Sequence, residues 1–484
     1  MEHLPIGLHR ILVGVSGAIG MNLVITAFLI LLILNLFVAL LFKQVRNPSL
    51  RSFISLFVGL TWCALLYNVQ NTMMLVAIST IVYFITSTGF MAPAKFAMLA
   101  IAILSGFHIY RMMIDYMGWT LDVTGPLMLF TAKFTTFAFD VYDGSRSNRG
   151  EVLSTESHVS VAREKTCLTT VPSLFEFYVF IFDFLGVLAG PVFHIREYLD
   201  FINLRGEFVS MHISFFRVVI DRFSSALVLG AVFAVAGTIP GLSVEYLVSV
   251  DHKAHPFVVR IFTVHIITLL SRMRYYFAWY MAETACLIAG IGYNPSNRDK
   301  FSRSQNAIIS KVDWANCQSE AVSHWNISIS KWLRGCIYLR AHESPIPSFL
   351  AGKIGHRQYA TLLTRFTSAF WHGFYPGYYL CFFSTVLQFE ADSIARKFIR
   401  PLFTKTGSTT PHWIYTLAGK IHTAVCLNYY GSAFVVLSAT TAFDIWTDLY
   451  FSVHILNIAT IVLVPVVCKT LFRSKYSKHE KKTE

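Results

Sequence analysis

Residues 11–43 read ILVGVSGAIGMNLVITAFLILLILNLFVALLFK, and Lys43 carries the only charge in this stretch. A membrane-spanning helix needs about 20 consecutive apolar residues, so the stretch is longer than one straight crossing requires. It must be helical, because lipid offers no partner to an unpaired backbone amide. It also lacks the short apolar core and small-residue cleavage site of a signal peptide. We therefore expect it to stay in the membrane.

Comparable apolar stretches recur along the chain, which is 55% hydrophobic and only 14% charged over 484 residues. A soluble protein carries charge on about a quarter of its residues. The pattern predicts an all-α, polytopic integral membrane protein with about 11 transmembrane helices, in one membrane domain over residues 1–472 and a basic tail over 473–484. The stretches fall at 11–43, 52–68, 72–90, 93–113, 124–141, 174–190, 223–249, 256–270, 273–291, 366–388, 413–440 and 445–472.

The formal net charge is +13, and the basic residues lie between the apolar blocks. This distribution argues against a nucleic-acid partner and favours the positive-inside rule, with attraction of anionic lipid or substrate in addition. The eight cysteines show no metal-ligand or disulfide spacing. We expect neither a metal site nor a cofactor.

Three polar connections separate the apolar blocks. Residues 142–171 are balanced in charge and predict a mobile loop, whereas 192–222 mixes charges with aromatic residues and looks interfacial. Residues 292–365 hold ten Lys or Arg against four Asp or Glu, with tryptophans in short amphipathic runs. This region is expected to be cytosolic and to fold against the membrane.

The carboxyl end of the sequence carries Lys481 and Lys482, the third and fourth residues from its last residue. They resemble the dilysine retrieval signal of endoplasmic reticulum membrane proteins. The alternative is a basic cluster that contacts anionic lipid. Both interpretations place this tail in the cytosol, and the first predicts residence in the endoplasmic reticulum membrane.

His372 lies in SAFWHGFYPGYY, residues 368–379. A histidine inside an apolar segment is costly and is a functional candidate by default. Pro376 lacks the amide that would bond to the carbonyl of His372, so the helix should bend or loosen there. Gly373 and Gly377 leave room for another helix or a substrate. The alternative is a histidine that is hydrogen-bonded between helices.

Asn326 lies in WNISISKWLR, residues 325–334. Trp325, Ile329 and Trp332 recur at helical spacing, which by itself indicates an interfacial amphipathic helix. Asn326-Ile327-Ser328 is also a glycosylation sequon, and it is a chance match if the region is cytosolic.

Other segments accompany these two in the chain. They are VYDG at 141–144, PSLFEF at 172–177, GP at 190–191, RYYFAW at 274–279, AETAC at 282–286 and GIGYN at 290–294. In combination and in this order, the segments resemble the lysophospholipid acyltransferase branch of the membrane-bound O-acyltransferase (MBOAT) superfamily. The resemblance implies helices of MBOAT type around a central catalytic chamber. Two features depart from the family pattern: Asn326 and His372 are 46 positions apart, a longer spacing than the family's, and Asp140 stands in place of an asparagine.

The resemblance implies that His372 is the general base and that Asn326 is its polar partner. Transfer from acyl-CoA, the expected co-substrate, requires a lysophospholipid hydroxyl to be deprotonated as it attacks the thioester, and neutral imidazole suits that task. Asn326 would stabilise the oxyanion or orient the hydroxyl. No G-x-S-x-G motif occurs, which favours direct transfer over an acyl-enzyme. The other substrate-binding candidates are Trp325, Lys331, Trp332, Arg334, Trp371, Tyr375, Tyr379, Glu283 and Asp143.

The phosphates of CoA would be attracted by basic residues of the 292–365 region, although each of these can equally be a determinant of topology. They are Lys331, Arg334, Arg340, Lys353 and Arg357. The competing class is a proton-coupled transporter, against which stands the absence of an internal repeat. Among acyltransferases, the alternative acceptors are diacylglycerol, a sterol or a secreted protein. The head group, the acyl chain and the oligomeric state are left open by the sequence.

Overall fold

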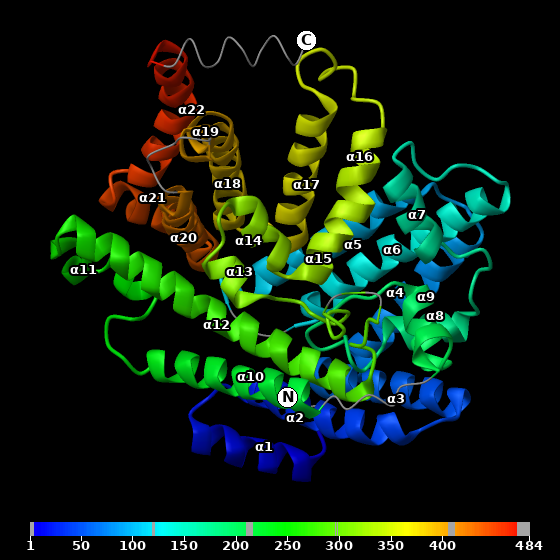
Figure 1. Ribbon diagram of the computed structural model, residues 1–484. Helices are drawn as coiled ribbons and strands as arrows, with labels where there is room; N and C mark the ends of the chain where they lie inside the picture. The colour runs from blue at the N-terminus through cyan, green and yellow to red at the C-terminus, as the bar shows by residue number, and fades with distance from the viewer. Residues whose placement is uncertain are drawn as a thin grey trace. The chain divides into compact units, whose positions relative to one another are not determined.

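The computed structural model describes residues 4–118, 122–209, 216–295, 297, 299–404 and 412–471, and these ranges contain helices and no strand (Figure 1). The prediction of an all-α fold is therefore confirmed. The basic tail at 473–484, with its two terminal lysines, lies outside the described residues.

The chain divides into two compact units. The first comprises Met1–Leu229, Tyr275–Asn306 and Ile327–Phe374, and the second comprises Gly230–Arg274, Ala307–Asn326 and Tyr375–Glu484. A single domain over 1–472 stays a prediction.

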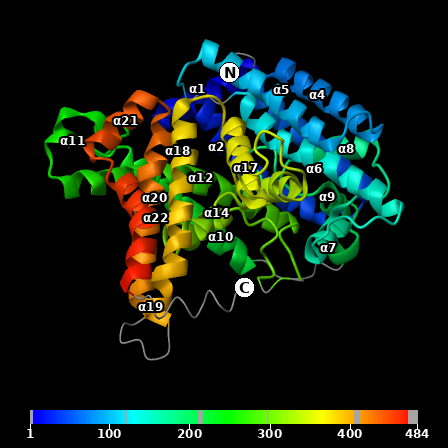
Figure 2. The ribbon, with the colours of Figure 1, turned by 90° about the horizontal axis from the view of Figure 1, so that it is seen from above.

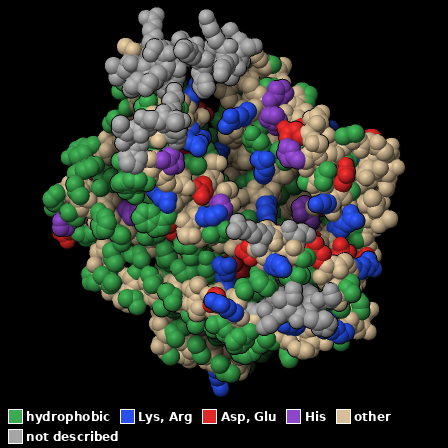
Figure 3. Space-filling model, in the orientation of Figure 1, with side chains coloured by type: hydrophobic (Ala, Val, Ile, Leu, Met, Phe, Trp, Pro, Cys, Tyr) green, Lys and Arg blue, Asp and Glu red, His purple; other side chains and the backbone are tan. Residues whose placement is uncertain are grey.

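Six helices in the described ranges are long and apolar enough to cross a membrane, by length and composition. Large apolar side chains are exposed on them, such as Phe53 on α3 and Met98 on α5, and hydrophobic side chains cover much of the face in Figure 3. Such exposure suits a lipid environment. The expected number of about 11 spans stays a prediction. The six are α2 (Leu23–Gln44), α3 (Pro48–Tyr67), α4 (Val69–Ser87), α5 (Pro93–Ile114), α10 (Phe216–Ala236) and α22 (Ser452–Leu471).

The core of the first unit is α6 (Thr124–Asn148), which packs against α4, α5 and α7. Lys133 of α6 is fully buried and ion-paired with Asp183, and its amine also donates to the carbonyls of Phe180 and Ile181 at 2.9 Å. Buried charge is tolerated when it is paired in this way. The other helices wholly within this unit are α1 (Ile6–Ile19), α7 (Ser157–Thr166), α8 (Leu174–Ile181), α9 (Ile195–Ile202), the 3₁₀ turn η1 (Gly206–Phe208), α15 (Ile327–Trp332), the π-helical turn η3 (Leu333–Tyr338), α16 (Leu339–Glu343) and α17 (His356–His372).

In the second unit, α18 (Pro376–Ile394) packs against α20 (His412–Val436) and α22, and the three lie side by side in Figures 1 and 2. A Cβ atom on Gly377 would lie 2.2 Å from the carbonyl oxygen of Ala433 on α20. The expectation that this glycine admits a neighbouring helix is confirmed. The remaining elements are η2 (Glu245–Val248), α11 (Val250–Ala254), α13 (Ile309–Asp313), α14 (Gln318–His324), η4 (Ala395–Ile399), α19 (Arg400–Thr404) and α21 (Ala439–Asp448); α12 (Phe257–Ala289) contributes to both units.

Two of the polar connections, residues 142–171 and 292–365, are largely helical. The prediction of a mobile loop over 142–171 is wrong, because α6 continues to Asn148 and α7 follows. Charged side chains fix this segment: Arg163 of α7 donates to Glu343 at 2.8 Å and to the carbonyl of Leu153 at 2.6 Å. The 292–365 region folds into α13 to α16 and the start of α17, as its amphipathic runs predicted.

Candidate active site

His372 is the last residue of α17, and the helix does not bend there but ends. Gly373 follows with φ +115°, in a region that favours glycine, and Pro376 is the first residue of α18. The sequence predicted a bend because proline was taken as a kink within one helix, whereas here it begins a new helix. His372 is partly buried and stands where the regular backbone stops.

His108 of α5 contacts the same chain segment, although it was not a candidate from the sequence. Its ring is buried, with Nε2 3.1 Å from the carbonyl oxygen of Trp371. A Cβ atom on Gly373 would lie 3.2 Å from two atoms of this ring. A histidine within the apolar stretch 93–113 was the available signal.

Trp332 and Trp371, one from each motif, pack against each other with ring centroids 6.0 Å apart. Both indoles are anchored on α6, since Trp332 donates to Thr135 Oγ1 at 2.6 Å and Trp371 donates to the carbonyl of Met128 at 2.8 Å. Both rings are buried. This contact joins α15 to the end of α17 inside the first unit.

Asn326 has φ +45°, a left-handed conformation that asparagine tolerates better than most residues. The two residues after it are held by Asn306, whose backbone carbonyl accepts from Ile327 N at 2.8 Å and whose Oδ1 accepts from Ser328 N at 3.0 Å. Glu283 in turn accepts from the backbone amide of Asn306 at 2.6 Å. This Asn306 clamp, as we name it, fixes the backbone that leaves Asn326.

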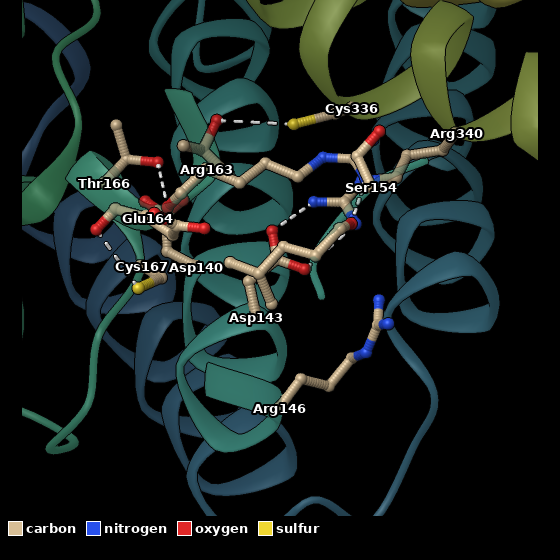
Figure 4. A network of polar contacts seen from close by, with 12 residues as sticks. Asp140, Asp143, Arg146, Ser154, Arg163, Glu164, Thr166, Cys167, Cys336 and Arg340 are labelled. Carbon is tan, nitrogen blue, oxygen red and sulfur yellow. Dashed lines mark hydrogen bonds and ion pairs between the residues drawn. The ribbon is translucent and has the colours of Figure 1, made fainter. Parts of the chain in front are cut away.

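The remaining candidates fall into different surroundings. Glu283 is buried and also ion-paired with Arg222 at 3.2 Å. Asp143 is buried and accepts two hydrogen bonds from Arg340, one of them at 2.9 Å (Figure 4). These carboxylates therefore fix the protein's own backbone and side chains.

Arg334 lies with its guanidinium 5.8 Å from the ring centre of Tyr338. His372 belongs to the first unit, whereas Asn326, Trp325, Tyr375 and Tyr379 belong to the second. Pairing of His372 with Asn326 at one site stays a prediction.

A cavity of about 520 Å³ opens within the first unit. Its buried lining residues include Thr136 of α6 together with Ser328 and Trp332 of α15. In the rest of the lining, basic side chains outnumber acidic ones, and most of them come from the two polar connections before α10. They are Lys165, His194, Arg196, Arg205, Arg303 and Lys331, accompanied by the acidic residues Glu197, Asp200 and Glu207.

The charges in this cavity are unequally neutralised. Arg303 forms ion pairs with both Glu197 and Glu207. Within the described part of the chain, no carboxylate forms an ion pair with Lys165, Arg205 or Lys331, whose side chains are solvent-exposed. Arg196 is likewise exposed and bonds only backbone carbonyls among the contacts of the described residues. The described part of the cavity thus offers four cations without a carboxylate partner to an anionic ligand.

His194 adds a titratable group to the cavity. Its Nδ1 lies 2.9 Å from Asp140 Oδ2 on α6. Burial works to lower the pKa of His194, but the carboxylate of Asp140 outweighs it, so the pKa is raised above its ordinary value. Asp140, the residue that departs from the expected asparagine, therefore favours the imidazolium form.

The model of the membrane-bound O-acyltransferase (MBOAT) family matches residues 113–439, more than half of the chain. The chain belongs to this family. The matched range contains Asn326, His372 and Asn306, and it begins after His108.

Several MBOAT-type relatives are similar over most of this chain. A Drosophila melanogaster protein named lysophospholipid acyltransferase 6 is 27% identical, over 94% of this chain and 63% of its own length. A Schizosaccharomyces pombe lysophospholipid acyltransferase is 26% identical, over 87% and 82% respectively. The human membrane-bound glycerophospholipid O-acyltransferase 2 is 28% identical, over 73% and 66%. The chain thus spans just under two thirds of the fly and human proteins.

Proposed function

We propose that this protein transfers an acyl chain from acyl-CoA to the free hydroxyl of a lysophospholipid, as part of phospholipid remodelling (the Lands cycle). Membership of the MBOAT family and the names of the relatives support this acceptor. The observation that carries the proposal is the cationic cavity. Its cations suit the phosphates of CoA, and its wall includes Trp332, whose ring packs against the neighbour of His372.

In the proposed reaction, His372 acts as general base. Its neutral imidazole accepts the proton of the lysophospholipid hydroxyl while the hydroxyl oxygen attacks the thioester carbonyl carbon. The C–S bond then breaks, CoA leaves as a thiolate, and the proton passes from the imidazolium to that sulfur. Asn326 donates its amide to the oxyanion or orients the hydroxyl. The acyl chain moves directly, without an acyl-enzyme.

The cavity supplies the binding side of this proposal. Of the basic residues expected to attract CoA from the 292–365 region, Lys331 lines the cavity, whereas Arg340 is engaged with Asp143. Lys165 and Arg205 supply further cations from segments that the sequence interpretation left without a role. All three are exposed, so they can meet a donor that arrives from water.

The test uses membranes that contain the full chain, one radiolabelled acyl-CoA and a panel of lysophospholipids with choline, ethanolamine, serine, inositol or glycerol head groups. Labelled diacyl phospholipid should form with at least one acceptor, and membranes with equal amounts of His372→Ala should form none above background. Parallel arms with diacylglycerol and with a sterol test the alternative acceptors. Labelled product in those arms alone would replace the proposed acceptor, and no consumption of acyl-CoA in any arm would overturn acyl transfer.

We further propose residence in the endoplasmic reticulum membrane, with the carboxyl-terminal tail and the 292–365 region in the cytosol. The lysines at 481 and 482 and the ten basic residues of that region support this topology. Epitopes placed in either segment should be reachable after selective permeabilisation of the plasma membrane. A glycosidase-sensitive mass shift that disappears in Asn326→Gln would place the sequon in the lumen instead.

A further inference from the structure

We propose that His108 is a positioning residue for His372, and that it acts on the backbone on both sides of that residue. The inference rests on the proposed function, because it concerns the same candidate base. His108 lies on α5, before the range matched by the family, and 263 residues before the carbonyl group that it contacts.

The first contact precedes His372. Nε2 of His108 lies 3.1 Å from the carbonyl oxygen of Trp371. A carbonyl oxygen only accepts, so Nε2 carries the hydrogen and donates it. Trp371 lies in the last turn of α17, where carbonyl groups have no intrahelical amide to bond with. The imidazole of another helix therefore caps this one at the residue before His372.

The second contact follows His372. Gly373 has φ +115°, and a Cβ atom there would lie 3.2 Å from both Cγ and Nδ1 of His108. The ring thus occupies the space beside Gly373 that a side chain would need. Because the ring bonds residue 371 and fills the space beside residue 373, the direction in which the His372 side chain leaves the backbone is restricted.

The cost of placing histidine here indicates that its hydrogen bond matters. His108 is only 7% exposed, whereas its neighbours Ile109 and Tyr110 are exposed on the same helix. A buried polar side chain in an apolar helix costs free energy unless it is hydrogen-bonded. Leucine would fill comparable space without that cost, but it could not cap α17. Loss of the bond should therefore misplace the base without removing it.

The experiment compares His108→Leu, which keeps bulk and loses the donor, with His108→Gln, whose side-chain amide can donate from a similar position. Tyr110→Leu is the control on the exposed face of α5. All variants are assayed in membranes, normalised to inserted protein. We expect His108→Leu to lower kcat about 10- to 100-fold, the range for one buried hydrogen bond, with KM for acyl-CoA and lysophospholipid within about twofold. His108→Gln should recover most of kcat, and Tyr110→Leu should match wild type.

Wild-type kcat in His108→Leu would overturn the proposal, and so would equal losses in the Leu and Gln variants or an effect on KM alone. If His108→Leu does not accumulate, His108→Asn replaces it, because its shorter amide cannot reach the carbonyl of Trp371.

A second readout needs no turnover. The rate at which diethyl pyrocarbonate modifies His372, followed by mass spectrometry of the peptide, should change in His108→Leu and return toward wild type in His108→Gln. An inactive wild-type protein would refute the proposed function, whereas unchanged modification rates would refute the positioning role.

Discussion

The segments that carry His372 and Asn326 are held in contrasting ways. His372 ends a regular helix of 17 residues, and a side chain from the distant helix α5 bonds the carbonyl of Trp371 before it and lies beside Gly373 after it. Asn326 lies between α14 and α15 in a left-handed conformation, and the residues after it are fixed by Asn306, only 20 residues earlier in the chain. One segment depends on helix packing, whereas the other depends on backbone conformation.

This difference teaches that the same kind of substitution tests different things in the two segments. At His372, removal of the side chain leaves the helix end and its cap in place. At Asn326, replacement by most residues also adds a left-handed backbone penalty of about 1 kcal/mol or more. A loss of activity in an Asn326 variant therefore requires a control for the change in backbone conformation. A loss of activity in a His372 variant does not.

The largest expected effect comes from His372→Ala. Loss of a general base lowers the rate by about 10²–10⁴-fold, and the protein should still insert because the cap on Trp371 remains. Product formation per inserted protein is the measurement. Acylation at close to the wild-type rate would show that His372 is not the general base and that the end of α17 has only a structural role.

A comparison of Asn326→Ala with Asn326→Gly separates chemistry from backbone. Both remove the amide, but glycine adopts φ +45° without penalty. If the amide acts in the transition state, both variants should lose about 10²–10³-fold in kcat. Recovery of activity in the glycine variant would instead assign Asn326 a conformational role. If both residues act on one transition state, the loss in Asn326→Gly/His372→Ala should fall well short of the product of the single losses.

The Asn306 clamp should give an intermediate effect. Asn306→Ala removes the acceptor for the buried amide of Ser328, and an unmade buried hydrogen bond costs about 1–3 kcal/mol. We expect kcat to fall about 10-fold and thermal stability to fall with it. Asn316→Ala is the matched control, because Asn316 is exposed and, among the residues that the structure describes, its amide groups bond the nearby Glu320. Equal kcat and equal thermal stability in Asn306→Ala and Asn316→Ala would show that the Asn306 clamp does not support the segment after Asn326.

The smallest effect is expected from Asp140→Asn, outside both segments. The raised pKa of His194 keeps the imidazolium, and hence its attraction for phosphate, to a higher pH; the attraction is lost as pH rises through that pKa. Glu197 supports the charged form and Lys331 opposes it. Without the Asp140 carboxylate, the rise of KM for acyl-CoA should begin at a lower pH. At a pH within that window, KM should increase by up to about fivefold, because the His194 side chain is partly exposed and the ion pair is screened by solvent. Identical KM–pH curves from pH 6 to 9 would exclude His194 from donor binding.

The sequence predicted local features, such as helices and motifs, but not the contacts between residues that are far apart in the chain. Apolar stretches predicted helices, because each stretch contains its own hydrogen-bond partners, and the two motifs singled out His372 and Asn326. The end of α17 at His372 was missed, because Pro376 suits a helix start as well as a kink. His108 and Asn306 could not be assigned, because neither pattern nor spacing reveals which backbone group a distant side chain will reach.

The sequence did not predict this cavity, although one of its lining residues was a candidate. Lys331 was expected to attract the donor and lines the cavity, whereas Lys165 and Arg205 lie in segments that looked like connections. Charge counting cannot distinguish a cation that faces a cavity from one that is neutralised, as the Asp143–Arg340 pair illustrates. That distinction depends on which carboxylates the fold brings near, and a single sequence does not contain it.

Helix α6 contacts both the cavity and the end of α17. Asp140, which holds His194, and Met128, which holds the ring of Trp371, are twelve residues apart on this helix. At 1.5 Å per residue, the two levels are separated by about 18 Å along its axis. A donor bound by its charged end beside His194 and reacting beside Trp371 must therefore be extended over about this length. The length of α6 would then select against acyl donors whose arm is shorter than this separation.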